Sequence, residues 1–269
     1  MSVKHIEMVV FDWAGTTIDY GCIAPLDAFV SSFKEYGVDI TPEEARAPMG
    51  MKKRDHVAAI LGIERVVRIW QNKHGRFPDE NDIEGIYTSF EKKICATLSS
   101  YCTPIPGVIE TLEQLRDNGL KIGSTTGYTR EMMDIVVPEA KKNGYHPDYL
   151  VTSSDVPAGR PYPYMIWSNA VALDVPDLQH IVKVGDTKAD IAEGVSAGVW
   201  TVAIIEGSSI WALSKEETKA LSPQNYHSRF STCQNICMNA GAHYVIKDIT
   251  KLPEILAIID SQIELGKRA

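Results

Sequence analysis

The sequence predicts an α/β protein with a doubly wound, mostly parallel sheet and a helical cap domain inserted after the first strand. An apolar run at residues 8–11 ends on Asp12 and a glycine–threonine turn, a pattern typical of a buried central strand. A helical block follows, and from Pro104 onward strand-like and helix-like segments alternate. Such alternation favours parallel βαβ units with helices on both faces of the sheet, which is a Rossmann-like arrangement.

The block that follows the first strand has helical periodicity throughout. Residues 26–33 carry apolar side chains three and four positions apart, and residues 41–44 join a capping threonine, a proline and two acids at a helix start. Further helices are predicted at residues 51–61, 64–74 and 83–98. We therefore expect a cap domain at residues 20–103 and a core formed by residues 1–19 and 104–269.

The second part of the chain supplies the remaining layers of the core. Strands are predicted at residues 120–125, 149–152, 181–184, 200–205 and 243–246. Helices are predicted at residues 107–118, 129–143, 161–173, 188–197, 223–240 and 252–265.

Composition and charge limit the classes of partner. At 269 residues the chain exceeds one average domain, and 44% hydrophobic with 23% charged residues is ordinary for a globular protein. The net charge of −8 argues against nucleic acid as a partner. An anionic small-molecule substrate would therefore have to be held by local cations or by a metal.

The cysteines and the apolar segments indicate a cytoplasmic protein. The five cysteines are scattered and form no C-x-x-C pair, which suits reduced thiols better than disulfides or a zinc site. Glu7 interrupts the only early apolar run, so we expect no signal peptide. No stretch approaches the ~20 apolar residues of a membrane span, so we expect no membrane partner.

Acidic residues follow two of the predicted strands. Asp12 and Asp186 would meet at one edge of the sheet, where two carboxylates repel each other unless a cation lies between them. Oxygen-only ligands suit Mg²⁺. Asp190 lies one helical turn after Asp186 and can orient it. The alternatives are a core strand that simply ends on Asp12, and acids that only cap the helix near residue 188.

Three further residues suit a phosphoryl group. Thr126 and Gly127 directly follow a predicted strand and can donate a hydroxyl and an N–H to phosphoryl oxygens. Arg160 can hold two such oxygens with its planar fork, although a surface arginine is the alternative. If a metal and cations such as Arg160 neutralise the negative charge of the phosphoryl oxygens, the Asp12 carboxylate can accept a phosphoryl group covalently.

Four segments, at residues 12–16, 122–127, 159–161 and 184–190, occur in an order that resembles the haloacid dehalogenase superfamily of aspartyl-phosphate enzymes. The resemblance implies that Asp12 is both nucleophile and metal ligand. It also implies Mg²⁺ bound by Asp12, Asp186 and the backbone carbonyl of Ala14. At the position of Arg160 the superfamily more often has lysine.

Ala14 departs from the pattern of the superfamily. Most of its phosphatases carry an acid there, and alanine cannot protonate a leaving oxygen. The subgroup with alanine is the phosphonoacetaldehyde hydrolases, or phosphonatases, and the similarity extends into residues 49–56. That similarity implies a Schiff base on Lys53, because a carbon leaving group needs an electron sink.

Spacing alone does not choose between Lys52 and Lys53, which lie four and three residues before His56. Without the resemblance, residues 52–54 would be interpreted as a solvated helix face. An unperturbed lysine has a pKa of ~10.4, so a nucleophilic amine needs burial or nearby cations.

The resemblance also implies supporting residues and a homodimer. It places Met49, His56, Cys22 and Tyr128 near the substrate, although core packing explains Met49 and Cys22 equally well. We expect residues 26–36 to form the dimer contact.

The predicted function is Mg²⁺-dependent cleavage of the C–P bond of phosphonoacetaldehyde to acetaldehyde and phosphate, through a lysine Schiff base and an aspartyl phosphate. The alternative is a Mg²⁺-dependent phosphatase or phosphomutase of a small phosphate ester, against which Ala14 argues. A third hypothesis is a non-catalytic phosphate-binding protein. The joint presence of Asp12, Thr126, Arg160 and Asp186 argues against it.

Overall fold

Six parallel strands form the centre of the protein, in the order β3-β2-β1-β4-β5-β6. The computed structural model describes residues 3–269, so residues 1 and 2 of the predicted core lie outside the described part. The strands are β1 (Met8–Phe11), β2 (Lys121–Thr126), β3 (Tyr149–Thr152), β4 (Ile181–Gly185), β5 (Trp200–Ile204) and β6 (Tyr244–Ile246). The predicted doubly wound α/β fold is confirmed.

The strand order reverses at β1, which pairs with both β2 and β4. In open α/β sheets, ligands bind at the carboxyl ends of the strands beside such a reversal. Phe11 lies opposite Ser124 of β2 and Val184 of β4. Asp12, Thr126 and Asp186 follow these three residues by one or two positions, so the register brings them to the same edge.

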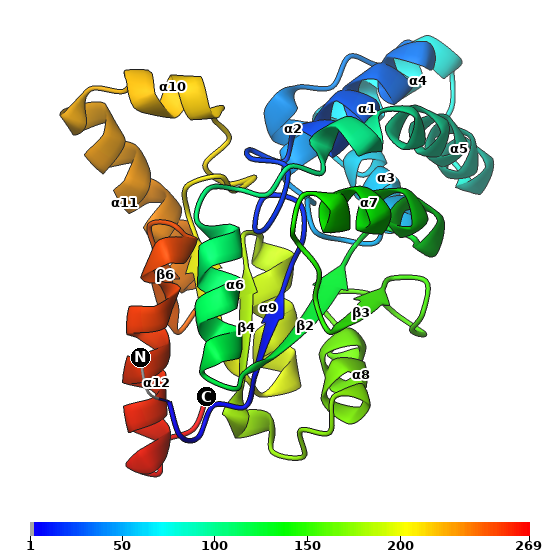
Figure 1. Ribbon diagram of the computed structural model, residues 1–269. Helices are drawn as coiled ribbons and strands as arrows, with labels where there is room; N and C mark the ends of the chain where they lie inside the picture. The colour runs from blue at the N-terminus through cyan, green and yellow to red at the C-terminus, as the bar shows by residue number, and fades with distance from the viewer. Residues whose placement is uncertain (1–2) are drawn as a thin grey trace.

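Helices cover both faces of the sheet (Figure 1). Successive side chains of β1 point to opposite faces: Val9 and Phe11 join one apolar cluster, and Met8 and Val10 join another. The first cluster includes α6 (Val108–Asp117), α7 (Arg130–Lys142) and α12 (Leu252–Glu264), which follows a short 3₁₀ turn, η3 (Ile249–Lys251). The second includes α8 (Tyr164–Ala172), and α9 (Lys188–Ala197) packs beside it on β4 and β5. Another 3₁₀ turn, η2 (Leu178–His180), leads into β4.

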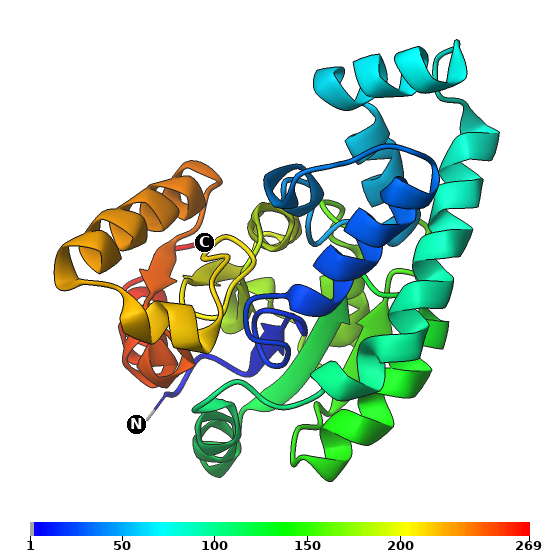
Figure 2. The same cartoon turned by 90° about the horizontal axis from the view of Figure 1, so that it is seen from above.

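Between β1 and β2 the chain forms a group of helices above the carboxyl ends of the strands (Figures 1 and 2). They are α1 (Ile23–Glu35), α2 (Pro42–Arg46), α3 (Lys53–Leu61), α4 (Glu64–His74), α5 (Glu80–Thr97) and η1 (Leu98–Tyr101). We call residues 20–103 the cap segment. Phe29, Trp70 and Phe90 are fully buried in it, and Thr41 and Glu44 form the expected capping box. The division into cap domain and core stays a prediction, as does a homodimer through α1.

Several helices differ from the predictions, and α1 and α5 begin at Ile23 and Glu80, each three residues before the predicted start. Helix α8 begins at Tyr164 rather than at residue 161, because Tyr162 precedes Pro163 and a residue before proline disfavours the helical conformation. Helix α3 begins at Lys53 rather than at residue 51, and α10 (Lys215–Ala220) was not predicted. It precedes α11 (Pro223–Asn239), whose Cys233 and Cys237 are buried. No helix within residues 3–269 is long and apolar enough to cross a membrane.

A candidate active site at the carboxyl edge of the sheet

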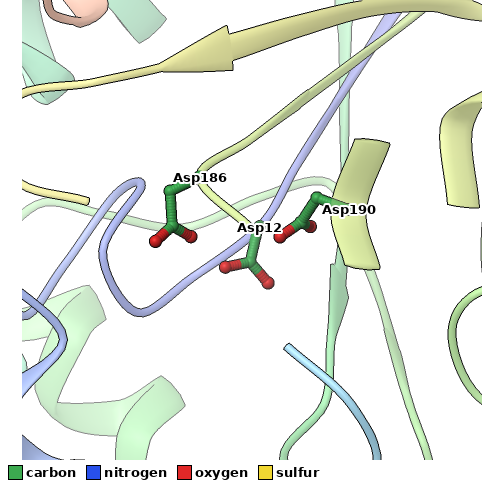
Figure 3. Close-up of side chains that lie close together, drawn as sticks. All are labelled: Asp12, Asp186 and Asp190. Carbon is green, nitrogen blue, oxygen red and sulfur yellow. The ribbon is translucent and has the colours of Figure 1, made fainter. Parts of the chain in front are cut away.

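Three buried carboxylates meet at the reversal point of the sheet. Asp12 follows β1, Asp186 follows β4 and Asp190 lies in the first turn of α9. Oxygen atoms of the three side chains lie within 4.8 Å of one another. Figure 3 shows the three carboxylates side by side, with Asp12 between the other two. The sequence-based prediction that strand ends bring Asp12 and Asp186 together is confirmed.

Two loops hold the Asp186 carboxylate in place. In the loop after β1, the Thr16 hydroxyl donates a hydrogen bond to Asp186 Oδ1 at 3.1 Å. In the loop after β5, the Ser209 N–H donates one to Asp186 Oδ2 at 2.7 Å. Gly15 has a φ of +89°, and a Cβ there would lie 2.5 Å from Asp186 Oδ2. Glycine at position 15 therefore allows both the turn and the close approach of the carboxylate.

Asp190 caps a helix, one of the two alternatives that the sequence left open, and it also pairs with two buried cations, while its orienting of Asp186 stays a prediction. It forms a capping box with Thr187 at the start of α9. Its Oδ1 also lies 2.8 Å from Lys183 Nζ and 3.0 Å from Arg160. Although burial opposes ionisation, the charges of Arg160 and Lys183 lower the pKa of Asp190. Asp190 is therefore a charged carboxylate held between two cations.

The other two carboxylates are less well compensated: Asp12 contacts Arg160 alone, and Asp186 forms no ion pair with a described residue. Burial raises the pKa of Asp12, and burial together with the charges of Asp12 and Asp190 raises that of Asp186 well above its ordinary value. Two buried cations, Arg160 and Lys183, face four buried carboxylates: Asp12, Asp186, Asp190 and Glu193. When these six groups are all ionised they carry two excess negative charges, of which the buried Lys53 beside them balances at most one. One divalent cation with oxygen ligands fits this site.

Arg160 is a buried residue and not a surface arginine. Its guanidinium contacts Asp12 Oδ1 at 2.7 Å, Glu193 Oε2 at 2.9 Å and the Thr125 carbonyl at 3.0 Å. Only 4% of the residue is exposed. Because the guanidinium lies against the Asp12 carboxylate, it can contact an oxygen atom of any group that bonds to Asp12.

A small cavity joins the cap segment to the sheet edge. Its volume is about 20 Å³, enough for one water molecule. Nine of the twelve predicted site residues line it: Asp12, Ala14, Cys22, Met49, Lys53, Thr126, Gly127, Tyr128 and Arg160. Gly50 and Thr187, which the sequence analysis missed, complete the lining. Asp186, Asp190 and His56 are buried but do not line it.

Lys53 lines this cavity and Lys52 does not. Lys53 is the first residue of α3 and is 3% exposed. Its Nζ is 5.0 Å from the centroid of the Tyr128 ring. Burial lowers the pKa of the Lys53 ammonium, which increases the fraction of neutral amine. Lys52 is the N-cap residue of α3 and is partly exposed.

Cys22 and Tyr128 line the cavity with Lys53, and His56 is buried close to Lys53 without lining the cavity. Burial raises the pKa of the Cys22 thiol and of the Tyr128 phenol, so both are neutral at pH 7. His56 packs on Phe29, with ring centroids 3.9 Å apart, and its Nε2 lies 2.8 Å from the Ala45 carbonyl oxygen. Burial and the charge of Lys53 lower the pKa of His56 well below its ordinary value. His56 is therefore a neutral side chain.

The cap segment touches the sheet edge through backbone atoms. A Cβ at Gly127 would lie 2.6 Å from the Met51 carbonyl oxygen and 2.8 Å from that of Gly50. The Gly50 carbonyl in turn accepts a hydrogen bond from Arg160 at 3.4 Å. Glycine at position 127 is therefore what allows the loop at residues 50–51 to close over the site.

Comparison with known proteins agrees with this geometry. The model of the haloacid dehalogenase-like hydrolases matches residues 9–204. The phosphonoacetaldehyde hydrolase of Bacillus cytotoxicus is 50% identical over 257 residues, which cover 96% of this chain and 97% of that protein. The chain belongs to the phosphonoacetaldehyde hydrolase family of haloacid dehalogenase-like hydrolases. The resemblance found in the sequence is confirmed.

Three other proteins are similar to this chain, one of them much longer and one of them similar in fold alone. A bifunctional phosphonoacetaldehyde hydrolase/aminoethylphosphonate transaminase of Clostridioides difficile is 51% identical over 259 residues, but the chain spans only 41% of that protein. The crystal structure of a phosphonoacetaldehyde hydrolase-like protein from Oleispira antarctica superimposes with a TM-score of 0.96 at 34% identity, covering 100% of this chain and 98% of the other. A β-phosphoglucomutase of Clostridium difficile shares the fold at 15% identity, with a TM-score of 0.67, 97% of this chain and 99% of the other being covered.

Proposed function

We propose that this protein is a Mg²⁺-dependent hydrolase that converts phosphonoacetaldehyde and water to acetaldehyde and phosphate. The observation that carries the proposal is the shared cavity of Asp12 and Lys53, a carboxylate and a buried amine. Ala14, where most phosphatases of the superfamily have an acid, lines the same cavity and cannot protonate a leaving oxygen. A site with these residues suits a leaving carbon rather than a leaving oxygen.

Lys53 begins the reaction. Its neutral amine adds to the aldehyde carbon, and loss of water gives a protonated imine. Burial, which lowers the pKa of Lys53, favours the neutral amine needed for this addition. The cationic imine then accepts the electron pair of the C–P bond, so the leaving group is a neutral enamine rather than a carbanion.

Asp12 receives the phosphoryl group. Its carboxylate attacks phosphorus as the C–P bond breaks, which gives an aspartyl phosphate and the enamine on Lys53. Arg160, in contact with Asp12, and the Thr126 and Gly127 donors hold the phosphoryl oxygens. Mg²⁺, bound by Asp12, Asp186 and the Ala14 carbonyl, would neutralise charge on these oxygens.

Two waters then release the products. One hydrolyses the aspartyl phosphate to free phosphate. The enamine takes up a proton at carbon, and the second water hydrolyses the resulting imine to acetaldehyde and the Lys53 amine. Because imine formation released one water, the net reaction consumes one water. The cavity of about 20 Å³ is smaller than the substrate, so the cap segment has to move to admit it.

Borohydride trapping tests the proposal at the residue that carries it. Sodium borohydride should inactivate the protein only when phosphonoacetaldehyde is present, and mass spectrometry of a digest should locate one reduced adduct on Lys53. Lys53→Arg should abolish both the adduct and phosphate release, because guanidinium forms no imine. Lys52→Arg is the matched control and should retain both.

Two outcomes would contradict the proposal. An adduct on Lys52 would overturn the assignment of the lysine. Absence of any adduct, together with faster phosphate release from simple phosphate esters than from phosphonoacetaldehyde, would favour a phosphatase.

A further inference from the structure

We propose that Glu193 and Lys183 are positioning residues, which fix the Arg160 guanidinium against Asp12. The inference rests on the proposed function in one respect, the role of Arg160 as a phosphoryl-binding cation. Neither Glu193 nor Lys183 lines the catalytic cavity, so neither contacts substrate. They would act only through Arg160.

Both residues carry charge in the interior of the core. Lys183 lies on the central strand β4 and Glu193 on α9, and both are 0% exposed. Burying an ionised side chain is costly unless it is paired and hydrogen-bonded. Lys183 Nζ is 3.3 Å from Glu193 Oε2, so each charge has the other as a partner. A buried ion pair contributes little net stability, so its presence here calls for another role.

The Thr125 hydroxyl links this pair to Arg160. It donates to Glu193 Oε2 at 3.1 Å and accepts from Lys183 Nζ and from Arg160, each at 2.8 Å. A hydroxyl has one donor and two acceptor sites, and here all are used. Thr125, Lys183 and Glu193 therefore form one connected platform, which has Arg160 on its cavity side.

The platform fixes the orientation of a planar group. Glu193 Oε2 accepts from Arg160 Nε at 2.9 Å, a different nitrogen from the one that contacts Asp12. The terminal nitrogen that contacts Asp12 at 2.7 Å is also bound by the Thr125 carbonyl and hydroxyl. A guanidinium held at two nitrogens cannot rotate, so its remaining nitrogen faces the Gly50 carbonyl of the cap segment.

Lys183 has a separate electrostatic effect. Glu193 and Asp190 are both buried acids beside Arg160, and alone they would neutralise its charge. Lys183 lies 2.8 Å from Asp190 and 3.3 Å from Glu193, so it balances part of their charge. Arg160 thereby keeps positive charge for a phosphoryl group.

A double-mutant cycle tests the role of Glu193. Glu193→Gln keeps the shape of the side chain but removes the charge that orients Arg160 Nε. A charge-assisted hydrogen bond of about 1.5–3 kcal/mol corresponds to a loss of about 10- to 150-fold. We expect a loss of that size in kcat/KM and in the affinity for inorganic phosphate with Mg²⁺, measured by calorimetry.

The second half of the cycle separates positioning from structure. Arg160→Lys keeps the positive charge but lacks the Nε–H that Glu193 binds. In that background Glu193→Gln should change phosphate affinity less than about 2-fold, because the two residues act as one unit. Equal losses in both backgrounds would overturn the proposal. Glu254→Gln, on the exposed face of α12, is the matched control and should have no effect.

A second variant guards against a folding failure. Thr125→Val preserves shape and removes only the hydroxyl that joins the platform, so phosphate affinity should again fall in the parent and not in the Arg160→Lys background. An unchanged affinity in the parent would contradict the proposal. Phosphate binding requires no turnover, so a parent that binds phosphate but does not cleave phosphonoacetaldehyde would refute the proposed function alone.

Discussion

Asp19, where the chain enters the cap segment, should make stability depend on pH. Its carboxylate accepts hydrogen bonds from the N–H groups of Ile23 and Ala24, at 3.0 and 3.1 Å, at the start of α1. Burial is the dominant effect and raises the pKa of Asp19 to about 6 from an ordinary value of 3.8. Between these two pH values the folded protein holds a proton that the unfolded chain has lost. The free energy of unfolding therefore falls as pH rises through this window.

The magnitude follows from the shift. A pKa difference of about two units corresponds to about 3 kcal/mol. Asp19→Asn cannot ionise, and asparagine tolerates the positive φ of 54° at this position. The free energy of unfolding of Asp19→Asn minus that of the parent should therefore rise by about 3 kcal/mol from below pH 4 to above pH 6.

Urea denaturation of both proteins at several pH values, with a chelator present, measures this difference. All other titrating groups are common to the two proteins and cancel. Asp117→Asn, at an exposed position on α6, is the control and should give a flat difference. A flat difference for Asp19→Asn as well, or one that falls with pH, would refute the reasoning.

Three more predictions concern the site. Exhaustive chelation should abolish phosphate release, and Mg²⁺ rather than Zn²⁺ should restore it, because Asp12, Asp186 and a carbonyl offer only oxygen ligands. Full activity of a protein in which elemental analysis finds no bound metal would contradict this. Ala14→Asp should impair phosphonoacetaldehyde turnover in a phosphate-release assay, because the new carboxylate adds negative charge beside Asp12. Turnover equal to that of the parent would show that position 14 does not set the reaction type. Gly127→Ala should lower kcat/KM by about 5- to 150-fold, the equivalent of about 1–3 kcal/mol of overpacking, because its Cβ would meet the Met51 carbonyl oxygen at 2.6 Å. Steady-state kinetics at parental values would show that the loop at residues 50–51 yields without cost.

Short apolar runs and helix-capping residues in the sequence predicted much of the fold. The strands at residues 8–11 and 149–152 and the helix at residues 188–197 have the predicted bounds, because apolar runs and caps mark their ends. Helix α10 was missed because its six residues, KEETKA, bury no side chain and carry no apolar period. Ser214 and Glu217 form a capping box there, which was the available signal.

The site was predictable where strand ends define it. Asp12, Asp186 and Thr126 follow apolar runs, and parallel strands bring such positions together. Lys183 and Glu193 gave no signal, because a lysine in a strand or a glutamate in a helix ordinarily faces solvent, and only tertiary pairing buries them. The choice between Lys52 and Lys53 depends on the residue at which α3 begins, and helix boundaries are the least certain part of a sequence interpretation.

The central position of β1 has a consequence for synthesis of the chain. This strand leaves the ribosome before its partners β2 and β4, which begin only at residues 121 and 181. The helices of the cap segment, whose contacts are local, can form while β1 still waits for both neighbours. The nascent chain thus carries Asp12 and Lys53 long before Asp186 emerges to complete the proposed set of metal ligands. We expect folding of the core to be limited by these distant pairings, and the site to assemble only once β4 has been inserted beside β1.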